Sequence, residues 1–527
     1  MRSKSILVSI LVVGLLLVGA SAALARSMKT PADTFVWDVY GPPESIDPGM
    51  NDSSVGERVL RSVYGTLVMN GPQGDEKLYP GLAESWEVAE DGQTFVFHLR
   101  QGVKFHNGNP FTADDVVFSF ERAIGIGRIP GQKLDEIANI ETVEKVDKYT
   151  VKIVTADPSP SLLRHVAGTP ASIIDKEWAL EHGDEGLSGE PAPYISTHAN
   201  GTGPYKLVEH KPREFFRFER YEDYWNGWDG EHVDEVRLRI VPEYSTRLME
   251  LLSGNADYID VSKSNISDVQ GIDGVKLDMS GLGNYILLVW LNTETEFLQN
   301  EKVRQALNYS FPYDRILNVA FRGTAVELDS VIGKTVYDYP KGVEWYDYDM
   351  DKAKQLLEEA GYGDGYSEPL TMYYDTGRSA RKKLGLIWKQ ELAKLGITLN
   401  VRAQDWPVMA EKVSVGDFSI YASGIWSTYP AASGYTYQFK SSASGSGGNY
   451  AFLKNEELDE LIDKAKTELE VENRVKTYRK VHDRVKELAP VIAVNQNSAF
   501  QVYGEWLKGV EYYPWGQLRF YDVYKEG

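Results

Sequence analysis

The sequence has no cysteine among its 527 residues. This absence excludes disulfide bonds, thiolate zinc sites, iron–sulfur clusters and cysteine nucleophiles, and it excludes a lipoprotein anchored through an N-terminal cysteine. Basic residues are also few, since 56 lysines and arginines face 77 aspartates and glutamates and the formal charge is −21. An acidic surface repels the phosphate backbone, so we expect no nucleic-acid partner.

Long apolar runs are missing after the N-terminus. Arg2 and Lys4 precede an apolar run at residues 6–18, and Ala23-Leu24-Ala25 follows it. A basic start, a short apolar run and an A-x-A end are typical of a secretory signal peptide. We therefore predict a signal peptide at residues 1–25, cleaved before Arg26, and a periplasmic or extracytoplasmic mature protein. An uncleaved anchor is the alternative, because a membrane span needs about 20 residues.

The motifs of several enzyme classes are missing as well. Gly333-Lys334-Thr335 ends like a phosphate-binding loop, but Leu328 stands where that loop needs glycine. The sequence contains no G-x-G-x-x-G, H-E-x-x-H or G-x-S-x-G string, and its eight histidines are scattered. The sequence therefore predicts no cofactor, no metal site and no catalytic residue. Acid/base pairs of carboxylates cannot be judged by counting, so a secreted glycan-processing enzyme remains as an alternative of a different class.

What the sequence does contain is core material and alternating elements. Its 42% of hydrophobic residues and its length predict two or three domains. Thr112 to Asp115 form a capping box ahead of an apolar stripe at Val116, Phe120 and Ile124, which predicts a helix. Helices are also predicted at residues 245–253, 301–308, 351–360, 384–395 and 456–469, and strands at 34–40, 236–240, 370–374, 397–401, 418–423 and 491–494. This alternation predicts an α/β chain with mixed sheets.

One long string carries a family resemblance. Residues 97–122 read FHLRQGVKFHNGNPFTADDVVFSFER, which strongly resembles the most diagnostic segment of the extracellular solute-binding protein family 5, the dipeptide, oligopeptide and nickel binding components of ABC importers. Further strings match the family in the same order, at residues 80–88, 201–207, 221–225, 303–309, 348–361 and 488–492. The resemblance therefore covers essentially the whole mature chain.

The resemblance implies a two-lobed periplasmic-binding-protein fold of type II, cluster C, with a hinge and an extra subdomain in the first lobe. The expected bounds are 26–75, 195–285 and 490–527 for lobe I, 76–194 for the extra subdomain and 286–489 for lobe II. The implied function is that of a monomeric, non-enzymatic binding component, which closes over its ligand. It would deliver that ligand to a membrane permease driven by a cytoplasmic ATPase.

The expected ligand is a peptide, with an oligosaccharide as the rival. Peptide-binding members carry an aspartate for the ligand's amino group after a Gly-Trp string, but residues 424–437 here read GIWSTYPAASGYTY. No Asp or Glu occurs between Asp417 and Glu456. A buried ammonium needs a countercharge. Either an acid from elsewhere serves, or the ligand has no such amine.

Candidate ligand-binding residues follow from the same resemblance and from residue chemistry. Aromatic side chains suit both sugar rings and peptide pockets, and a guanidinium suits a carboxylate. In the segment of the family's cleft contacts these residues are Trp426, Tyr429, Tyr435 and Tyr437, and further wall candidates are Trp406, Asn449 and Tyr450. Arg378 and Arg381 lie where peptide binders place a basic group for the ligand's carboxylate. A solvated basic face shared with Lys382 and Lys383 is an equally good interpretation of these two arginines.

Overall fold

The computed structural model describes residues 30–526 except 44, 52, 73–74, 76, 129, 131–133, 135–138, 185–190, 428–430 and 514–517, and except the side chain of Ser446. The predicted signal peptide and the candidate Tyr429 lie outside the described residues. Within the described part, no helix has both the length and the apolar character needed to cross a bilayer.

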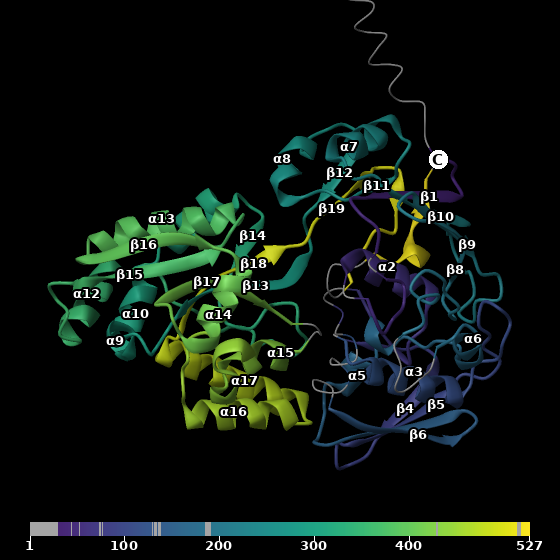
Figure 1. The fold of residues 1–527 in the computed structure, drawn as a ribbon, viewed down its shortest axis with the longest axis horizontal. Helices are drawn as coiled ribbons and strands as arrows, with labels where there is room; N and C mark the ends of the chain where they lie inside the picture. The colour runs from purple at the N-terminus through teal and green to yellow at the C-terminus, as the bar shows by residue number, and fades with distance from the viewer. Residues whose placement is uncertain are drawn as a thin grey trace, which may run out of the picture.

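Two large sheets define two lobes (Figure 1). The sheet of lobe I has the spatial order β12 (Val275–Asp278), β19 (Gln501–Gly504), β11 (Tyr258–Ile259), β1 (Thr34–Val39), β10 (Glu235–Ile240), β9 (Phe215–Arg220) and β8 (Tyr205–Lys211). β1 runs parallel to both of its neighbours. Because side chains alternate across a strand, Phe35 and Trp37 pack toward helix α2 (Ser54–Val63), and Val36 packs toward helix α7 (Tyr244–Ser253).

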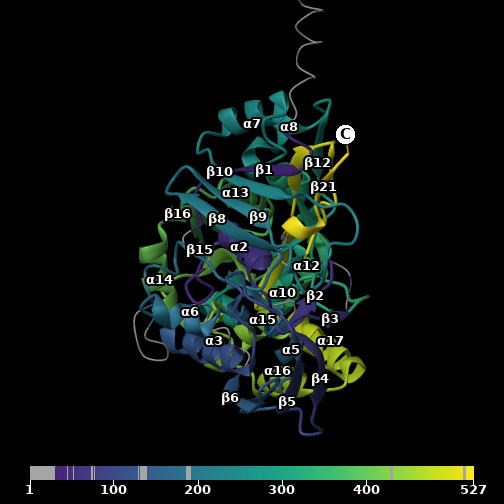
Figure 2. The ribbon, with the colours of Figure 1, turned by 90° about the vertical axis from the view of Figure 1, so that its right-hand side faces the viewer.

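Lobe I carries a smaller antiparallel sheet with a core of its own, at the lower right of Figure 1 and the bottom of Figure 2. Its order is β4 (Ala83–Val88), β5 (Thr94–Leu99), β7 (Thr150–Thr155) and β6 (Ile140–Asp147). Helix α3 (Ala113–Ile126) packs on it and begins at the predicted capping box, with the Thr112 backbone donating to Asp115. This unit is the extra subdomain that the family resemblance implies.

The extra subdomain is tied to the rest of lobe I by a buried ion triad. Arg122, near the end of α3, donates two hydrogen bonds to Asp47 at 2.8 and 2.7 Å and two to Asp184 at 2.9 and 2.8 Å. All three side chains are at most 3% exposed. A guanidinium matches two carboxylates in this way because its donors form a rigid fork.

Lobe II is built on the sheet β14 (Ala325–Glu327), β18 (Val491–Ser498), β13 (Leu282–Leu291), β17 (Ile420–Trp426), β15 (Tyr366–Asp375) and β16 (Ile397–Gln404). β15 is parallel to β16 and β17, and the other pairs are antiparallel. Its main helices are α10 (Glu301–Tyr309), α12 (Met350–Glu359), α13 (Ser379–Ala393), α14 (Trp406–Val415), α16 (Glu456–Thr467) and α17 (Val471–Leu488). The predicted α/β character with mixed sheets is confirmed.

The chain passes between the two large sheets twice, from β12 to β13 and from β18 to β19. The two crossings touch, since the Ala499 amide donates to the Gly281 carbonyl at 3.0 Å. The hydroxyl of Tyr512 lies 2.6 Å from the Asp278 carbonyl and 3.3 Å from that of Ala499. A Cβ at Gly281 would lie 2.4 Å from the Tyr512 ring, so glycine allows this close packing. These crossings are the hinge.

One expected boundary needs correction. Lobe I was expected to resume at residue 490, but β18 is hydrogen-bonded between β13 and β14 in the sheet of lobe II. Its residues Val491 and Ile492 pack in the core of lobe II. An apolar strand followed by the polar residues at 495–498 reads equally well in either sheet, so the sequence could not place the junction after β18.

Candidate functional site

The carboxyl ends of parallel strands in both sheets reach the boundary between the lobes next to the hinge. In lobe I, β1 leads to Tyr40 and β11 leads to Asp260. In lobe II, β15 ends at Asp375 and β17 at Trp426. Open α/β sheets bind ligands at the carboxyl ends of their strands. The fold therefore gives each lobe a wall of loop residues facing this boundary.

A hollow of about 400 Å³ opens on the lobe I side of this boundary. We call it the hinge hollow. Its lining residues are Tyr40, Ser54, Arg58, Arg247, Tyr258, Ile259, Asp260, Val261, Ser262, Ser498, Ala499, Phe500 and Val502. The size is that of a small-molecule site, which is commonly about 300 to 1,000 Å³. Because Ser498 to Phe500 belong to a hinge crossing, a ligand here would touch the segment that bends on closure.

The charges inside the hinge hollow are largely paired with one another. Arg58 lies 3.4 Å from Asp260 and stacks 4.8 Å from the ring centre of Trp37. The Trp37 indole donates to the same carboxylate at 3.3 Å. Arg247 donates to the carbonyls of Asp260, Val241 and Pro242. Asp260 is the only carboxylate among the residues that line the hollow.

The wall of lobe II contains a second paired network. Arg381 donates to the carboxylate of Asp375, to the hydroxyl of Tyr285 and, at 3.2 Å, to the Ala422 carbonyl. The Tyr421 hydroxyl donates to Asp375 at 2.7 Å, and burial raises the pKa of this tyrosine. The negative charge of Asp375 is thereby balanced by Arg381 within lobe II. Arg381 is 7% exposed. Arg381 orders this wall and has little guanidinium surface left for a ligand.

Two cations lie next to these networks but do not take part in them. Lys263 of lobe I and Arg378 of lobe II are both exposed, and neither side chain makes a hydrogen bond or ion pair with another described residue. The surrounding protein displaces water from Lys263, and the charge of Arg378 acts on it as well. Together these effects lower the pKa of Lys263 to about 8. Two positive charges close together raise each other's electrostatic free energy, and an anion beside them lowers it. This pair therefore attracts an anionic group.

The remaining sequence-predicted residues fall into two sets. Trp426, Tyr437 and Trp406 are more than half exposed. Tyr435 and Asn449 are at most 1% exposed. Tyr435 donates to the Asn284 carbonyl, and Asn449 donates to the carbonyls of Lys440 and Leu453. These two side chains are packing residues of lobe II, and we leave them out of the proposed site.

Tyr450 is intermediate between these sets. Its ring centre lies 5.3 Å from that of Trp290 and 5.6 Å from that of Tyr421, beside the Arg381 network.

Sequence reasoning missed Lys263, Asp260 and Tyr285. Asp260 and Lys263 directly follow the short apolar strand at Tyr258–Ile259, and their place after a strand was the one available signal.

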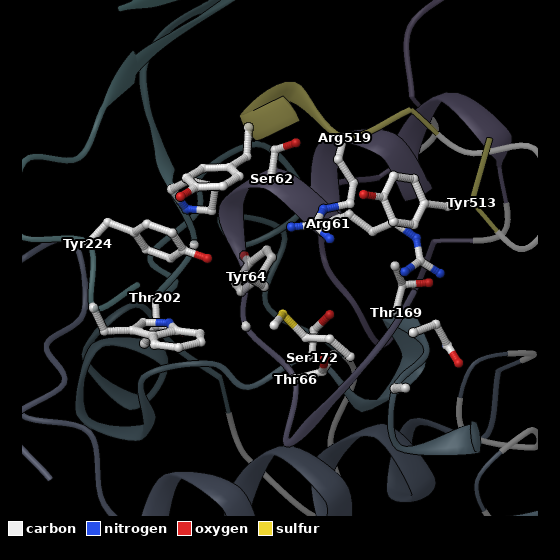
Figure 3. A pocket seen from close by; sticks show the side chains of 18 residues that line it. Arg61, Ser62, Tyr64, Thr66, Thr169, Ser172, Thr202, Tyr224, Tyr513 and Arg519 are labelled. Atoms are coloured by element: carbon white, nitrogen blue, oxygen red, sulfur yellow. The ribbon is translucent and has the colours of Figure 1, made fainter. Parts of the chain in front are cut away.

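A smaller cavity of about 60 Å³ lies inside lobe I (Figure 3). Arg61 and Arg519 lie on one side of it, and Thr202 and Tyr224 lie on the other. Its volume suits a few water molecules, which would satisfy wall atoms such as the buried Thr202 hydroxyl. It has no lining residue from lobe II, so it cannot sense lobe closure directly. Among the described residues, no cluster of His, Asp and Glu is arranged to hold a metal ion.

Two lobes joined by a paired crossing, with strand ends facing each other beside the hinge, define the class of two-lobed solute-binding proteins. The model described as bacterial extracellular solute-binding proteins, family 5 Middle, matches residues 77–447. The chain belongs to this family, so the resemblance seen in residues 97–122 and the fold that it implied are confirmed.

Relatives along the full length agree with this assignment. Heme-binding protein A of Haemophilus influenzae is 29% identical over 538 residues, which covers 96% of this chain and 95% of that protein. The dipeptide-binding protein of Escherichia coli is 27% identical over 538 residues, which covers 97% of this chain and 98% of that protein. The solved structure of HbpA2 from Haemophilus parasuis superposes with a TM-score of 0.84 at 26% identity, covering 94% of this chain and 100% of that one. The Haemophilus influenzae and Escherichia coli relatives are named as binding proteins and not as enzymes.

Proposed function

We propose that this protein is the extracytoplasmic substrate-binding component of an ABC importer, and that it captures di- or oligopeptides between its lobes. The observation that supports this most is a pair of exposed cations, Lys263 and Arg378, one from each lobe. Neither has a described hydrogen-bond or ion-pair partner for its side chain. A peptide's terminal carboxylate placed between them would receive charge-assisted hydrogen bonds from both sides. Such a ligand binds the closed arrangement better than the open one, and only this difference shifts the population toward closure.

The ligand's amino group needs an acidic partner, which the segment 424–437 does not supply. Asp260 supports the proposal here, because it is the carboxylate in the wall of the hinge hollow. It already shares its charge with Arg58, and one of its oxygens accepts from Trp37. We propose that an ammonium binds beside it, in exchange for water.

The loaded, closed form would then dock on a membrane permease whose cytoplasmic ATPase supplies the energy. The lack of a phosphate-binding loop in this sequence agrees with that division of labour. A monomer located outside the cytoplasmic membrane, after removal of residues 1–25, completes the proposal. A neutral oligosaccharide would leave both cations unpaired, and no relative reported above is named for sugar binding or glycan processing.

The test begins with native mass spectrometry of protein purified gently from its own envelope, followed by denaturing release of any bound ligand. Released peptides, and one-to-one retention of a synthetic dipeptide in titration calorimetry, are the expected results. Masses separated by hexose units would contradict peptide capture. Conversion of a glycan on incubation would contradict a binding protein altogether.

A further inference from the structure

At the end of the boundary far from the hinge, three side chains join the lobes. Arg164 belongs to α5 (Leu162–His165) in the extra subdomain, and its guanidinium carbon lies 4.9 Å from the ring centre of Tyr337 in lobe II. Arg474 of α17 lies 5.3 Å from the same ring. Both views of the ribbon place α5 beside the α16–α17 pair (Figures 1 and 2). We call these three residues the closure contact.

Each arginine is held in position by its own lobe. Arg164 donates to the Asn70 side chain at 3.0 Å and is 7% exposed. Arg474 donates to the carbonyls of Glu468 and Leu469 at 2.8 and 3.1 Å. The Arg164 guanidinium is therefore oriented before the lobes meet, and little side-chain freedom is lost when the Tyr337 ring arrives. Arg474 and Tyr337 already lie together within lobe II.

A second pair of elements meets at the same place. Gly92, in the turn between β4 and β5, approaches Leu469 so closely that a Cβ at Gly92 would lie 2.4 Å from the leucine side chain. Leu469 lies two residues before the start of α17, and its carbonyl is one of the acceptors of Arg474. The boundary here consists of packed groups from both lobes, in contrast to the open hinge hollow.

The closure contact is also connected to the predicted ligand segment. Asp338, next to Tyr337, is 1% exposed and lies 3.5 Å from Arg474. Its other oxygen accepts from the Ala432 amide at 2.7 Å. Ala432 begins the short helix α15 (Ser433–Thr436), between the cleft candidates Trp426 and Tyr437. A shift of that segment on ligand binding therefore moves Asp338, the carboxylate beside Arg474.

We propose that the stacking of Arg164 on Tyr337 stabilises the closed arrangement of the lobes, and that Asp338 couples this contact to the ligand segment. The contact forms only when the extra subdomain approaches lobe II, so it adds to closure and not to the folding of either lobe. A cation–π contact of this kind changes an equilibrium constant roughly 2- to 30-fold. This inference concerns closure itself, and the first readout below needs no ligand.

The absence of native cysteine makes a distance measurement direct. Val146→Cys in β6 and Val415→Cys in α14 are exposed positions in the extra subdomain and in lobe II, and they accept spectroscopic labels. The variants are Arg164→Met and Tyr337→Leu, with Tyr337→Phe as the conservative variant. Arg484→Met on α17, which removes the surface ion pairs with Glu457 and Glu487, is the matched control.

We expect Arg164→Met and Tyr337→Leu each to lower the ratio of closed to open protein roughly 2- to 30-fold, without adding when combined. Tyr337→Phe and the control should keep the distance distribution of the parent. Unchanged distributions in both variants, or a parent with no closed population, would overturn the proposal. Because these results are read on ligand-free protein, they stand apart from whether peptides bind. With a bound peptide, weaker apparent affinity in Tyr337→Leu is the second expected readout.

Discussion

The cations compared at the two ends of the boundary between the lobes differ in their partners. Far from the hinge, Arg164 and Arg474 donate to groups of their own lobes and stack on Tyr337. Beside the hinge, Lys263 and Arg378 have no described partner, and they lie close enough for one to lower the pKa of the other. The difference teaches that paired cations join parts of the protein, whereas the unpaired ones support the proposed place of an external anion.

The interior of lobe I shows the paired case in its strongest form. Arg122 is enclosed by Asp47 and Asp184 with four hydrogen bonds. Asp47 lies in the connection between β1 and α2, as does Tyr40, a residue of the hinge hollow. Fixed pairs of this kind hold the parts of lobe I in place relative to one another.

The largest expected effect comes from removing a buried, paired cation. Arg122→Met leaves two buried carboxylates without a countercharge, and we expect the free energy of unfolding to fall by about 3–5 kcal/mol. Urea denaturation measures this, with the surface arginine variant Arg237→Met as control. Ligand affinity of the folded fraction should change little. A loss no larger than that of the control would contradict the importance of the triad.

The next largest effect comes from removing either of the two unpaired cations. Lys263→Ala and Arg378→Ala should each weaken peptide binding about 10- to 150-fold, because a charge-assisted hydrogen bond contributes about 1.5–3 kcal/mol. The thermal stability of both variants should stay that of the parent. Titration calorimetry measures the affinity, with Lys389→Ala, an exposed change on the helix α13 that follows Arg378, as control. Parent-like affinity in both variants would remove these residues from the site.

A smaller effect is the pH dependence of binding. The pKa of Lys263 is about 8 in the free protein, and a bound carboxylate raises it by favouring the charged form. Below the free pKa the lysine is charged in both states, so binding moves no proton there. Between the free and the bound pKa, binding takes up a proton, and affinity falls as the pH rises. Calorimetry at pH 8.5 in HEPES and in Tris detects the uptake, and Lys263→Arg should abolish it.

Local patterns predicted the elements well. The capping box at Thr112 and Asp115 starts α3 as expected, and the helices predicted at 301–308 and 351–360 are α10 and α12 to within a residue. These features depend on neighbours in sequence. The family resemblance supplied the rest of the fold, because no periodicity tells which strands join which sheet, as the misplaced start of lobe I at 490 shows.

The candidate site was harder to predict. Arg378 was a candidate because it lies in a recognisable segment, but Lys263 was missed because it is over a hundred residues away and the charge of Arg378 acts on it only in the folded chain. Tyr435 lies in the predicted segment and Asn449 was a further wall candidate, yet both side chains are buried in lobe II. Sequence distance gives no information about which face of a segment looks into a cleft.

The central claim is that Lys263 holds the ligand's carboxylate together with Arg378. A double-mutant cycle tests it most directly, by measuring the affinity of one peptide as the free acid and as the C-terminal amide, with the parent and with Lys263→Ala. The account predicts that amidation weakens binding to the parent strongly and binding to the variant much less, which is a clear coupling between lysine and carboxylate. Equal losses on amidation in both proteins would contradict it.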